Sequence, residues 1–214
     1  MTRRWWRKST TEAYNRPWRE IDYAVVDLET TGLDLRRDTI ASYGIAIIRG
    51  GRMLAADQTY GLVRPECEIS PKSMTIHALR PADLAEAPPL AEAVDALADA
   101  LCNRVLIAHA AWIERAFLTR AFARHGRRMA CRIIDTAAMA RAADLDLSRG
   151  QGEPNLEQLA TVLGLPVVSP HHALGDAITT GYVFLALAAR LRQRGYQTAR
   201  DFIDLTDADR SLRL

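Results

Sequence analysis

The sequence predicts an α/β fold with a five-stranded mixed sheet of order 3-2-1-4-5, which contains one antiparallel strand and is flanked by helices. Three strand-like segments follow one another early in the chain with short turns between them, which indicates an antiparallel meander. Two later apolar segments, near residues 105 and 133, are each followed by a helical segment. We therefore expect these two strands to lie parallel to the first through helical crossovers.

The early strands are defined by apolar runs and by the turns that end them. The first is expected at Tyr23–Glu29, and a polar turn follows at Asp34–Asp38. The second is expected at Thr39–Ile48, where two glycines stop it, and the third at Leu54–Leu62. A loop at 64–71, a short helix at 71–79 and a turn at 81–84 come next.

The rest of the chain alternates between strands and helices. Apolar residues spaced three and four apart predict a helix at Leu90–Leu101. Later strands are expected at Arg104–Ala108 and Arg132–Ile134, the second ending at Asp135. Further helices are expected at Trp112–Arg124, Thr136–Ala143, Leu156–Leu163 with Asn155 as its N-cap, Asp176–Arg192 and, weakly, Ala199–Leu205.

The composition is typical of a globular protein, and its basic residues are concentrated near the N-terminus. The 214 residues are 49% hydrophobic and carry a net charge of +2, enough for one domain with its own core. Residues 1–20 hold six basic side chains against two acidic ones, together with Trp5, Trp6 and Trp18. Such an arm is suited to a phosphate backbone, a membrane surface or a protein partner, but we expect it first to fold onto its own domain. We divide the chain into an arm (1–20), a domain (21–195) and a short extension (196–214).

Cysteine usage and hydropathy predict a cytoplasmic protein without a membrane partner. Cys67, Cys102 and Cys131 are odd in number and not spaced for zinc, which is typical of reduced thiols. The N-terminus lacks the apolar segment of a secretory signal. The longest apolar stretch, near Tyr182–Leu191, is too short to span a bilayer and is expected to be a buried helix.

Two carboxylates, Asp27 and Glu29, lie at the end of the first strand. Residues two apart on a strand point to the same face, so the two side chains emerge together. Like charges on an apolar strand are costly unless something positive lies between them, and a divalent cation takes such oxygen ligands. The alternative is a strand end with solvated acids.

Other acidic and histidine side chains lie at the starts of helices. Glu114 is in the first turn of the helix after the fourth strand, and His171 precedes Asp176, which begins the longest helix. In an α/β sheet, the carboxyl ends of strands and the starts of the following helices face one crevice. Four carboxylates there suit two divalent ions about 4 Å apart, which is the arrangement for phosphodiester hydrolysis, and a histidine can take a proton from the attacking water.

Two motifs resemble those of a known family. Asp27-Leu28-Glu29-Thr30-Thr31-Gly32-Leu33 is similar to the first motif of the DnaQ-like, or DEDDh, 3′–5′ exonucleases, which include RNase T and the proofreading epsilon subunit of bacterial DNA polymerase III. The run from His171 to Ala177 is similar to the third motif, with the histidine five positions before Asp176. The similarity extends from about Tyr23 to Leu191.

The resemblance implies an RNase H-like architecture and a role for each motif residue. It implies that two Mg²⁺ or Mn²⁺ ions are bound by Asp27, Glu29, Glu114 and Asp176, and that His171 is the general base. Residues 76–79 resemble the loop near the 3′-terminal nucleotide, and residues 155–160 resemble the helix before the third motif. It also implies that Thr30, Leu33 and His77 lie against that nucleotide, although a structural role for His77 remains an alternative.

The middle motif departs from the family pattern, His-Asn-Ala-x-Phe-Asp. Glu114 stands where the family has an aspartate, so the carboxylate is kept on a longer stem. We expect it still to ligate; the alternative is a solvated helix residue and a weak second ion. Ile113 replaces an aromatic residue, and we consider neighbouring Trp112 as its substitute.

Several neighbouring polar residues are expected to be structural rather than catalytic. His109 is expected to buttress the fourth strand, and His172 to be a bystander. Asp135 is expected to support the ligands without binding the metal. Asp34 and Asp38 are expected to be turn residues.

The resulting hypothesis is an exonuclease that acts on nucleic-acid 3′ ends, with single-stranded DNA as the first candidate, in repair or maintenance. Only 38 residues follow Asp176 in the 214-residue chain, which leaves little room for a polymerase-binding tail, so a stand-alone enzyme is expected over one bound to a DNA polymerase or a repair protein. An exoribonuclease that acts on short RNA and a weakly or non-catalytic binding subunit are the alternatives. The oligomeric state stays open.

Overall fold

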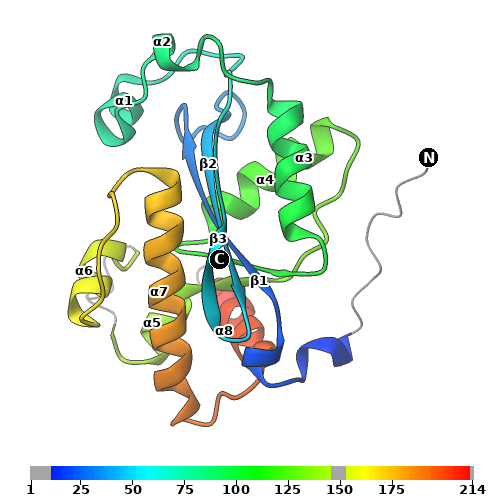
Figure 1. The fold of residues 1–214 in the computed structure, drawn as a ribbon, viewed down its shortest axis with the longest axis vertical. Coiled ribbons are helices and arrows are strands. Elements are labelled where there is room, and N and C mark those ends of the chain that lie inside the picture. Colours follow the sequence, from blue (N-terminus) through cyan, green and yellow to red (C-terminus); the bar gives the residue numbers. More distant parts are fainter. Residues whose placement is uncertain (1–10, 146–152, 213–214) are drawn as a thin grey trace.

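A five-stranded mixed sheet forms the centre of the computed structural model, which describes residues 11–145 and 153–212 (Figure 1). The strands are β1 (Tyr23–Thr30), β2 (Ile40–Arg49), β3 (Arg52–Leu62), β4 (Val105–Ala108) and β5 (Ile133–Asp135). Their order is β3-β2-β1-β4-β5. β2 is antiparallel to β1 and β3, whereas β4 and β5 continue parallel to β1. The predicted order and its single antiparallel strand are confirmed.

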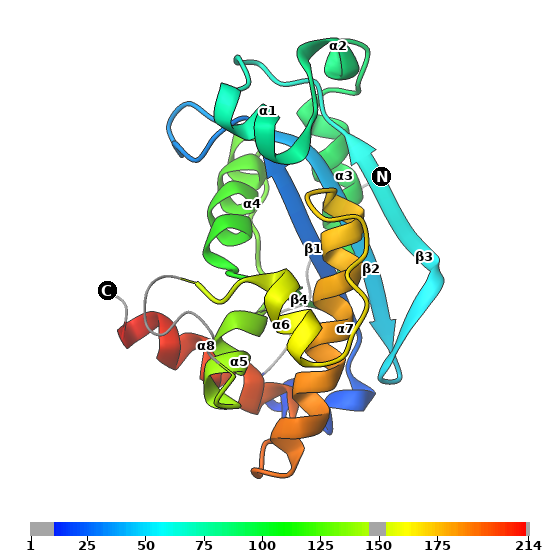
Figure 2. The ribbon, with the colours of Figure 1, turned by 90° about the vertical axis from the view of Figure 1, so that its left-hand side faces the viewer.

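The helices surround this sheet on both faces. They are α1 (Pro71–His77), α2 (Pro81–Leu84), α3 (Leu90–Leu101), α4 (Trp112–Arg124), α5 (Thr136–Ala142), α6 (Leu156–Val162), α7 (Ala173–Arg192) and α8 (Ala199–Leu212). Two short 3₁₀ helices, Thr11–Tyr14 and Trp18–Glu20, precede β1. α7 runs along one face, beside α5, α6 and α8, and α3 and α4 cover the other (Figure 2).

Three helix boundaries differ from the expected ones. α7 begins at Ala173 rather than at Asp176, because His172 is extended at the N-cap and its carbonyl accepts the Asp176 amide at 2.9 Å. The expected turn at Pro81–Leu84 is a four-residue helix. α8 runs to Leu212 instead of Leu205; its exposed side is polar, which hides its period, while its inner side carries the buried Phe202.

β1 directs alternate side chains into two separate cores. Tyr23 and Val25 pack in the core under α7, whereas Ala24 and Val26 pack in the core under α3 and α4. This follows from the two-residue period of a strand. Asp27 therefore continues the side of the strand that faces α7.

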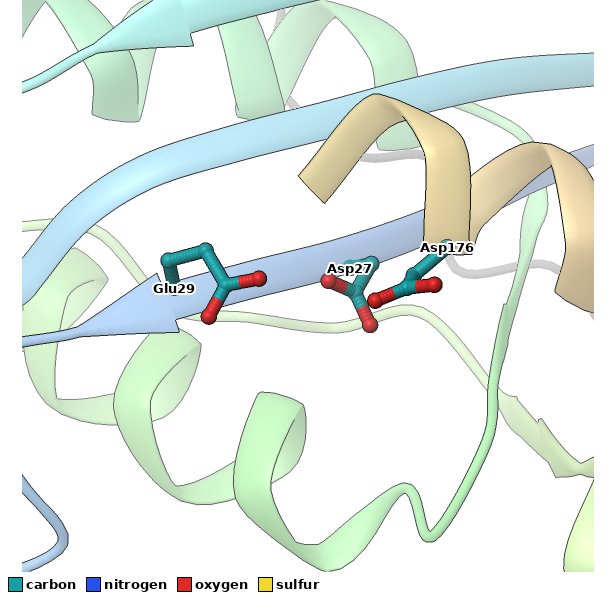
Figure 3. A group of neighbouring side chains, drawn as sticks. All are labelled: Asp27, Glu29 and Asp176. Atoms are coloured by element: carbon teal, nitrogen blue, oxygen red, sulfur yellow. The ribbon is translucent and has the colours of Figure 1, made fainter. Parts of the chain in front are cut away.

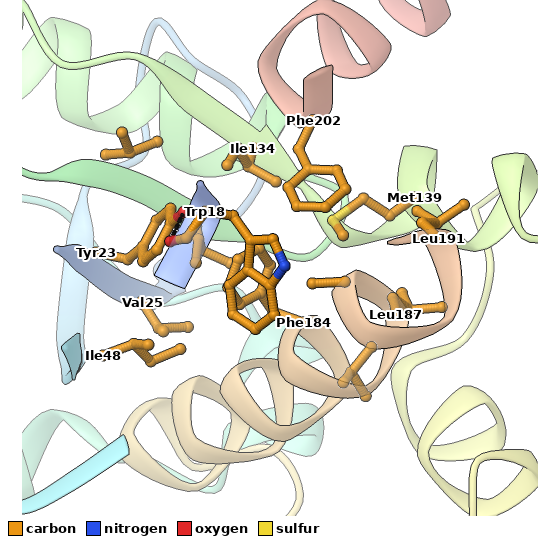
Figure 4. Close-up of a cluster of buried hydrophobic side chains, with 14 of the residues drawn as sticks. Trp18, Tyr23, Val25, Ile48, Ile134, Met139, Phe184, Leu187, Leu191 and Phe202 are labelled. Atoms are coloured by element: carbon orange, nitrogen blue, oxygen red, sulfur yellow. Dashed lines mark hydrogen bonds between the residues drawn. The ribbon is translucent and has the colours of Figure 1, made fainter. Parts of the chain in front are cut away.

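The core under α7 gathers aromatic residues from distant parts of the chain (Figure 4). Phe184 of α7 lies 5.8 Å from Trp18, 5.0 Å from Tyr23 and 6.2 Å from Phe202, measured between ring centroids. The Tyr23 hydroxyl donates a hydrogen bond to the Trp18 carbonyl at 2.6 Å. The core thus crosses the predicted boundaries at residues 20 and 195; Trp5, Trp6 and the basic residues up to Lys8 lie outside the described residues.

α7 is the centre of this core as well as the longest helix. By length and apolar composition alone it could span a membrane, but 56% of its apolar window is buried within the fold. Residues such as Phe184, Leu187 and Leu191 are fully buried in it. The expected buried helix at this place is confirmed.

Candidate active site

Three carboxylates meet where β1 passes the first turn of α7 (Figure 3). Asp27 and Glu29 come from β1, and Asp176 comes from α7. Each offers an oxygen, and these oxygens lie within 4.8 Å of one another. Carboxylate oxygens are the ligands that hard divalent cations prefer, so this group is suited to such an ion.

A glycine allows this approach of helix and strand. Gly44 of β2 lies directly opposite Asp27 in the antiparallel register. A Cβ atom placed there would lie 2.2 Å from the carbonyl carbon of Ala173, at the start of α7. The missing side chain therefore lets α7 bring Asp176 down to Asp27. The sequence prediction did not single out Gly44, although a lone glycine within an apolar strand is itself an indication of close backbone approach.

Glu114, the fourth predicted ligand, is buried in the first turn of α4 with 3% of its surface exposed. It lies outside the group of three whose oxygens are within 4.8 Å. Its charge is nevertheless the strongest charge influence on the pKa of Asp27. Its Oε2 atom is buried and has no hydrogen-bond partner within the described residues. Because it is buried, Glu114 is not a solvated helix residue. Its unpartnered Oε2 atom is free to bind a cation.

Burial and mutual repulsion raise the pKa of every carboxyl group in this cluster. Burial, followed by the charges of Glu114, Glu29 and Asp176, raises the pKa of Asp27 well above its usual range. Burial is also the main cause that raises the pKa of Glu29 to about 8, of Glu114 to about 8 and of Asp176 to about 6. Such shifts mark a site that lacks a compensating positive charge, which a cation would supply.

A pocket of about 370 Å³ opens over the carboxylates. It is lined by all eight predicted site residues: Asp27, Glu29, Thr30, Leu33, His77, Glu114, His171 and Asp176. The sequence prediction missed three other lining residues, which come from or border α1: Ser70, Lys72 and Ser73. Ile76, from the loop that was expected near the nucleotide, also lines the pocket. Lys72 of α1 is the one lysine or arginine that lines this pocket within the described residues.

His171 lies at the rim of the pocket. Its backbone has a φ of 59°, and its amide donates to Asp176 Oδ2 at 2.9 Å. Its side chain is 55% exposed, with Nε2 3.6 Å from Glu157 Oε1 of α6. The loop before α7 thus ties His171 to Asp176 through the backbone and leaves the ring open to the pocket and to solvent. Glu157 was not among the predicted site residues.

His77 joins α1 to the end of β1 through both ring nitrogens. Its Nδ1 accepts the Leu79 amide at 3.1 Å, so Nε2 carries the proton and donates to the Thr30 carbonyl at 3.2 Å. Burial lowers the pKa of this ring, in keeping with a neutral side chain. His77 lines the pocket, but its polar atoms are already engaged with the backbone. Leu33, in contrast, is 57% exposed at the mouth.

His109 and Asp135 hold the base of α4 in place. His109 contacts Thr136 Oγ1 at 2.8 Å and the Pro154 carbonyl at 2.6 Å. Asp135 accepts the amides of Ala137 at 2.8 Å and Ala111 at 3.1 Å. These bonds fasten the turn that precedes Glu114, as expected for supporting residues.

The remaining expectations concern Trp112, His172 and the turn after β1. Trp112 is not among the residues that line the acidic pocket; it lines a neighbouring groove, so it does not replace the aromatic residue for which Ile113 stands. The ring of His172 stacks on Tyr60 at 4.3 Å, which places it outside the pocket. Asp38 accepts hydrogen bonds from the Thr31 hydroxyl at 3.0 Å and the Asp34 amide at 2.7 Å, as a turn residue does.

Comparison with known proteins identifies relatives of the whole central part of the chain. An exonuclease family model of the RNase T type matches residues 24–184. A DNA polymerase III subunit epsilon-like protein of Rhodobacter capsulatus is 31% identical over 185 residues, which are 85% of this chain and 26% of that protein. The 3′-5′ exonuclease DinG of Staphylococcus epidermidis is 27% identical over 86% of this chain and 20% of that protein. The chain thus spans about a quarter, or less, of the length of the curated relatives that it matches.

Solved structures share the fold. Exonuclease X in complex with 5′ overhanging duplex DNA matches with a TM-score of 0.66 and 23% identity, over 86% of this chain and 99% of that one. Escherichia coli Exonuclease I in complex with a dT13 oligonucleotide matches with a TM-score of 0.70 and 14% identity, over 81% of this chain and 42% of that one. These likenesses confirm the expected RNase H-like architecture.

Proposed function

The chain belongs to the exonuclease family whose model matches residues 24–184, and from this premise we propose that it is a metal-dependent 3′–5′ exonuclease that releases nucleoside 5′-monophosphates from single-stranded DNA. The observation that carries the proposal is the set of converging carboxylates of Asp27, Glu29 and Asp176 on the floor of a pocket.

The donor set fits two divalent cations, and we propose Mg²⁺ or Mn²⁺. Asp27, Glu29 and Asp176 offer oxygens within 4.8 Å of one another, and the buried Glu114 Oε2 has no other partner in the described part of the chain. Four carboxylates with raised pKa values would be strongly stabilised by added positive charge. When bound, the ions would lower the pKa of a water molecule and neutralise charge on the transition state.

The protein's own residues position the substrate and move the proton. His171 at the rim accepts a proton from the attacking water, while its backbone bond to Asp176 keeps it next to the carboxylates. Leu33 and Ile76, which are 57% and 46% exposed at the pocket mouth, contact the terminal nucleoside. His77 contributes by fixing the Thr30 carbonyl rather than through a free ring nitrogen.

The burial of Glu114 supports a catalytic protein over the alternative of a non-catalytic binding subunit. A glutamate that had lost its role would be free to turn to solvent, but Glu114 is 3% exposed and influences the pKa of Asp27. Glu114 also lines the same pocket as the other three carboxylates. We propose that it binds the second ion.

The matched proteins and structures support DNA as the substrate. One matched protein is a DNA polymerase III subunit epsilon-like protein, and two solved structures with this fold are complexes with DNA. Short RNA is the second substrate to test. The three cysteines are free thiols, which supports a cytoplasmic location for a stand-alone repair or maintenance enzyme.

The test is degradation of a 5′-labelled single strand with Mg²⁺ and with Mn²⁺, alongside a 5′-overhanging duplex and an RNA of the same sequence. The wild-type protein should produce a ladder that shortens from the 3′ end. Asp27→Asn, which keeps the shape and removes the charge, should lower the rate by roughly a thousandfold. Asp57→Asn on the exposed edge of β3 is the matched control. A full rate from Asp27→Asn, or no ladder from the wild-type protein on any strand, would contradict the proposal.

A further inference from the structure

A second concave surface lies on the other side of the first turn of α4. This groove has a volume of about 700 Å³ and runs between α4 and the C-terminal part of α8. Trp112, Arg115, Ala116 and Thr119 line it from α4, at the three- and four-residue spacing of one helical face, and Arg210 lines it from α8. Leu35, on the turn after β1, closes one end.

Exposed apolar side chains gather around the acidic pocket and this groove. Five large hydrophobic residues are exposed in the described part of the chain. Leu33 and Ile76 line the pocket, Leu35 and Trp112 line the groove, and Val162 on α6 lines neither. Trp112 is 49% exposed, so part of this large aromatic residue is accessible to a partner.

The charges of the groove leave one arginine without a partner. The Arg115 side chain is half-buried and has no hydrogen bond or ion pair within the described residues. Its electrostatic neighbours include Arg210 and Asp207, and Asp207 is itself paired with Arg132 at 2.8 Å. Arg210 reaches Asp207 only at 3.9 Å. Two arginines that face each other at an apolar surface create a site for an anion.

The other charged side chains that line the groove are already engaged. Asp135 accepts two backbone amides, and Arg141 binds Asp209 at 2.6 Å and Glu153 at 3.3 Å. Arg120 donates to the carbonyls of the turn after β1, including Asp38 at 2.9 Å. Asp135, Glu153 and Asp209 therefore do not pair with Arg115. The charged side chain of the groove that has neither a hydrogen bond nor an ion pair in the described part of the chain is this arginine.

We propose that this groove binds the strand that is being degraded, upstream of its 3′-terminal nucleotide. Trp112 stacks on a base, and Arg115 with Arg210 holds an adjoining phosphate. An exposed aromatic ring next to an unpaired arginine is the arrangement with which proteins grip single strands without reading their sequence. The groove and the pocket share the first turn of α4, where Ile113 and Glu114 face the pocket and Trp112 and Arg115 face the groove. This inference rests on the proposed exonuclease function.

The experiment compares substrates that reach the groove with one that does not. The probes are dT2, dT4 and dT8, and the p-nitrophenyl ester of thymidine 5′-monophosphate, which fills the acidic pocket alone. Trp112→Ala should lower the ratio of kcat/KM on dT8 to kcat/KM on the ester about tenfold, through KM, because stacking on an aromatic side chain contributes about 1–3 kcal/mol. Trp112→Phe should restore most of the ratio, because it keeps an aromatic ring.

Arg115→Gln tests the phosphate contact independently, through the salt dependence of kcat/KM. Loss of one phosphate contact should reduce the slope of log kcat/KM on dT8 against log salt by about 0.7, whereas Trp112→Ala should leave that slope close to wild type. Val162→Ala and Arg190→Gln are the matched controls, because both side chains are exposed and neither lines the groove or the pocket.

Binding in EDTA separates failure of this inference from failure of the proposed function. Anisotropy of 5′-fluorescein-labelled dT8 requires no hydrolysis, and both groove variants should weaken it by about tenfold relative to the controls. If the wild-type protein does not hydrolyse DNA but the groove variants still bind dT8 more weakly than the controls, only the proposed function is contradicted. Groove variants that keep the dT8-to-ester ratio, the salt slope and the affinity for dT8 would overturn the inference and leave the groove to a protein partner.

Discussion

The acidic pocket and the α4–α8 groove lie on two sides of one helical turn and differ in the sign of their unbalanced charge. In the pocket, Glu114 and three further carboxylates have raised pKa values and lack a nearby compensating cation. In the groove, Arg115 faces Arg210 without an acidic partner of its own. Each surface is incomplete without a ligand of opposite charge: a divalent cation in the pocket and a phosphate in the groove.

This difference predicts two kinds of kinetic defect. A change in the pocket should reduce hydrolysis of every substrate equally, because it alters the reacting centre. A change in the groove should affect only substrates that are long enough to reach it. Kinetic measurements on variants of the two surfaces test this contrast.

His171→Ala should have the largest effect of the three. Loss of a general base lowers rates by about 10²–10⁴-fold, and the loss should be the same for dT8 and for the p-nitrophenyl ester. His125→Ala at the exposed end of α4 is the control, because it removes a histidine outside the pocket. A variant that keeps a near wild-type rate at neutral pH would show that water is activated without His171.

Gly44→Ala should separate the geometry of the pocket from that of the groove. An added methyl group would meet the backbone of Ala173, so the start of α7 must move and carry Asp176 away from Asp27. We expect a loss of about 1–3 kcal/mol in the free energy of unfolding and a clear fall in kcat, with little change in the dT8-to-ester ratio. The measurements are urea unfolding and steady-state kinetics.

Gly126→Ala is the matched control for that substitution. Gly126 has a φ of +67° and no atom within 4 Å of an added Cβ, so alanine there strains the backbone without contacting anything. It should cost about 1 kcal/mol and leave hydrolysis intact. Equal losses of activity from both glycine variants would contradict the role given to Gly44.

The pH dependence of stability tests the charge of the pocket without any measurement of hydrolysis. Glu29 and Glu114 have a pKa near 8 in the folded protein against an ordinary value of 4.5, so between these pH values the folded state holds more protons than the unfolded state. The free energy of unfolding of the metal-free protein should therefore fall as the pH rises from about 4.5 to about 8. Urea unfolding in EDTA at pH 5 and pH 8 measures this, and a stability that rises over this window would contradict the unbalanced charge of the pocket.

Much of the fold follows from local sequence patterns, whereas part of the site depends on tertiary packing. The strand order could be predicted because short turns join the three early strands and the later strands are each followed by a helix. Asp27 and Glu29 could be placed together because a strand has a period of two. The contact between Gly44 and Ala173 could not, because it joins segments that are far apart in the chain.

Two site residues show where sequence reasoning stopped short. Trp112 was considered a substitute for an aromatic residue in the pocket, yet successive helical positions turn by about 100°, so Trp112 and Glu114 cannot face the same way. His77 was expected at the nucleotide, with a structural role as the alternative; it lines the pocket, and its two ring nitrogens bind the backbone of Thr30 and Leu79. The first result follows from helix geometry, and the second requires knowledge of where α1 packs.

The most direct test of the metal site is the number of Mn²⁺ ions bound per chain, measured by the electron paramagnetic resonance signal of free Mn²⁺ at pH 8 with thymidine 5′-monophosphate present. Four carboxylates that hold two ions predict two Mn²⁺ per wild-type chain, about one for Glu114→Gln and less than one for Asp27→Asn. Wild-type binding of less than one ion, or two ions retained by both variants, would contradict the account of the acidic pocket.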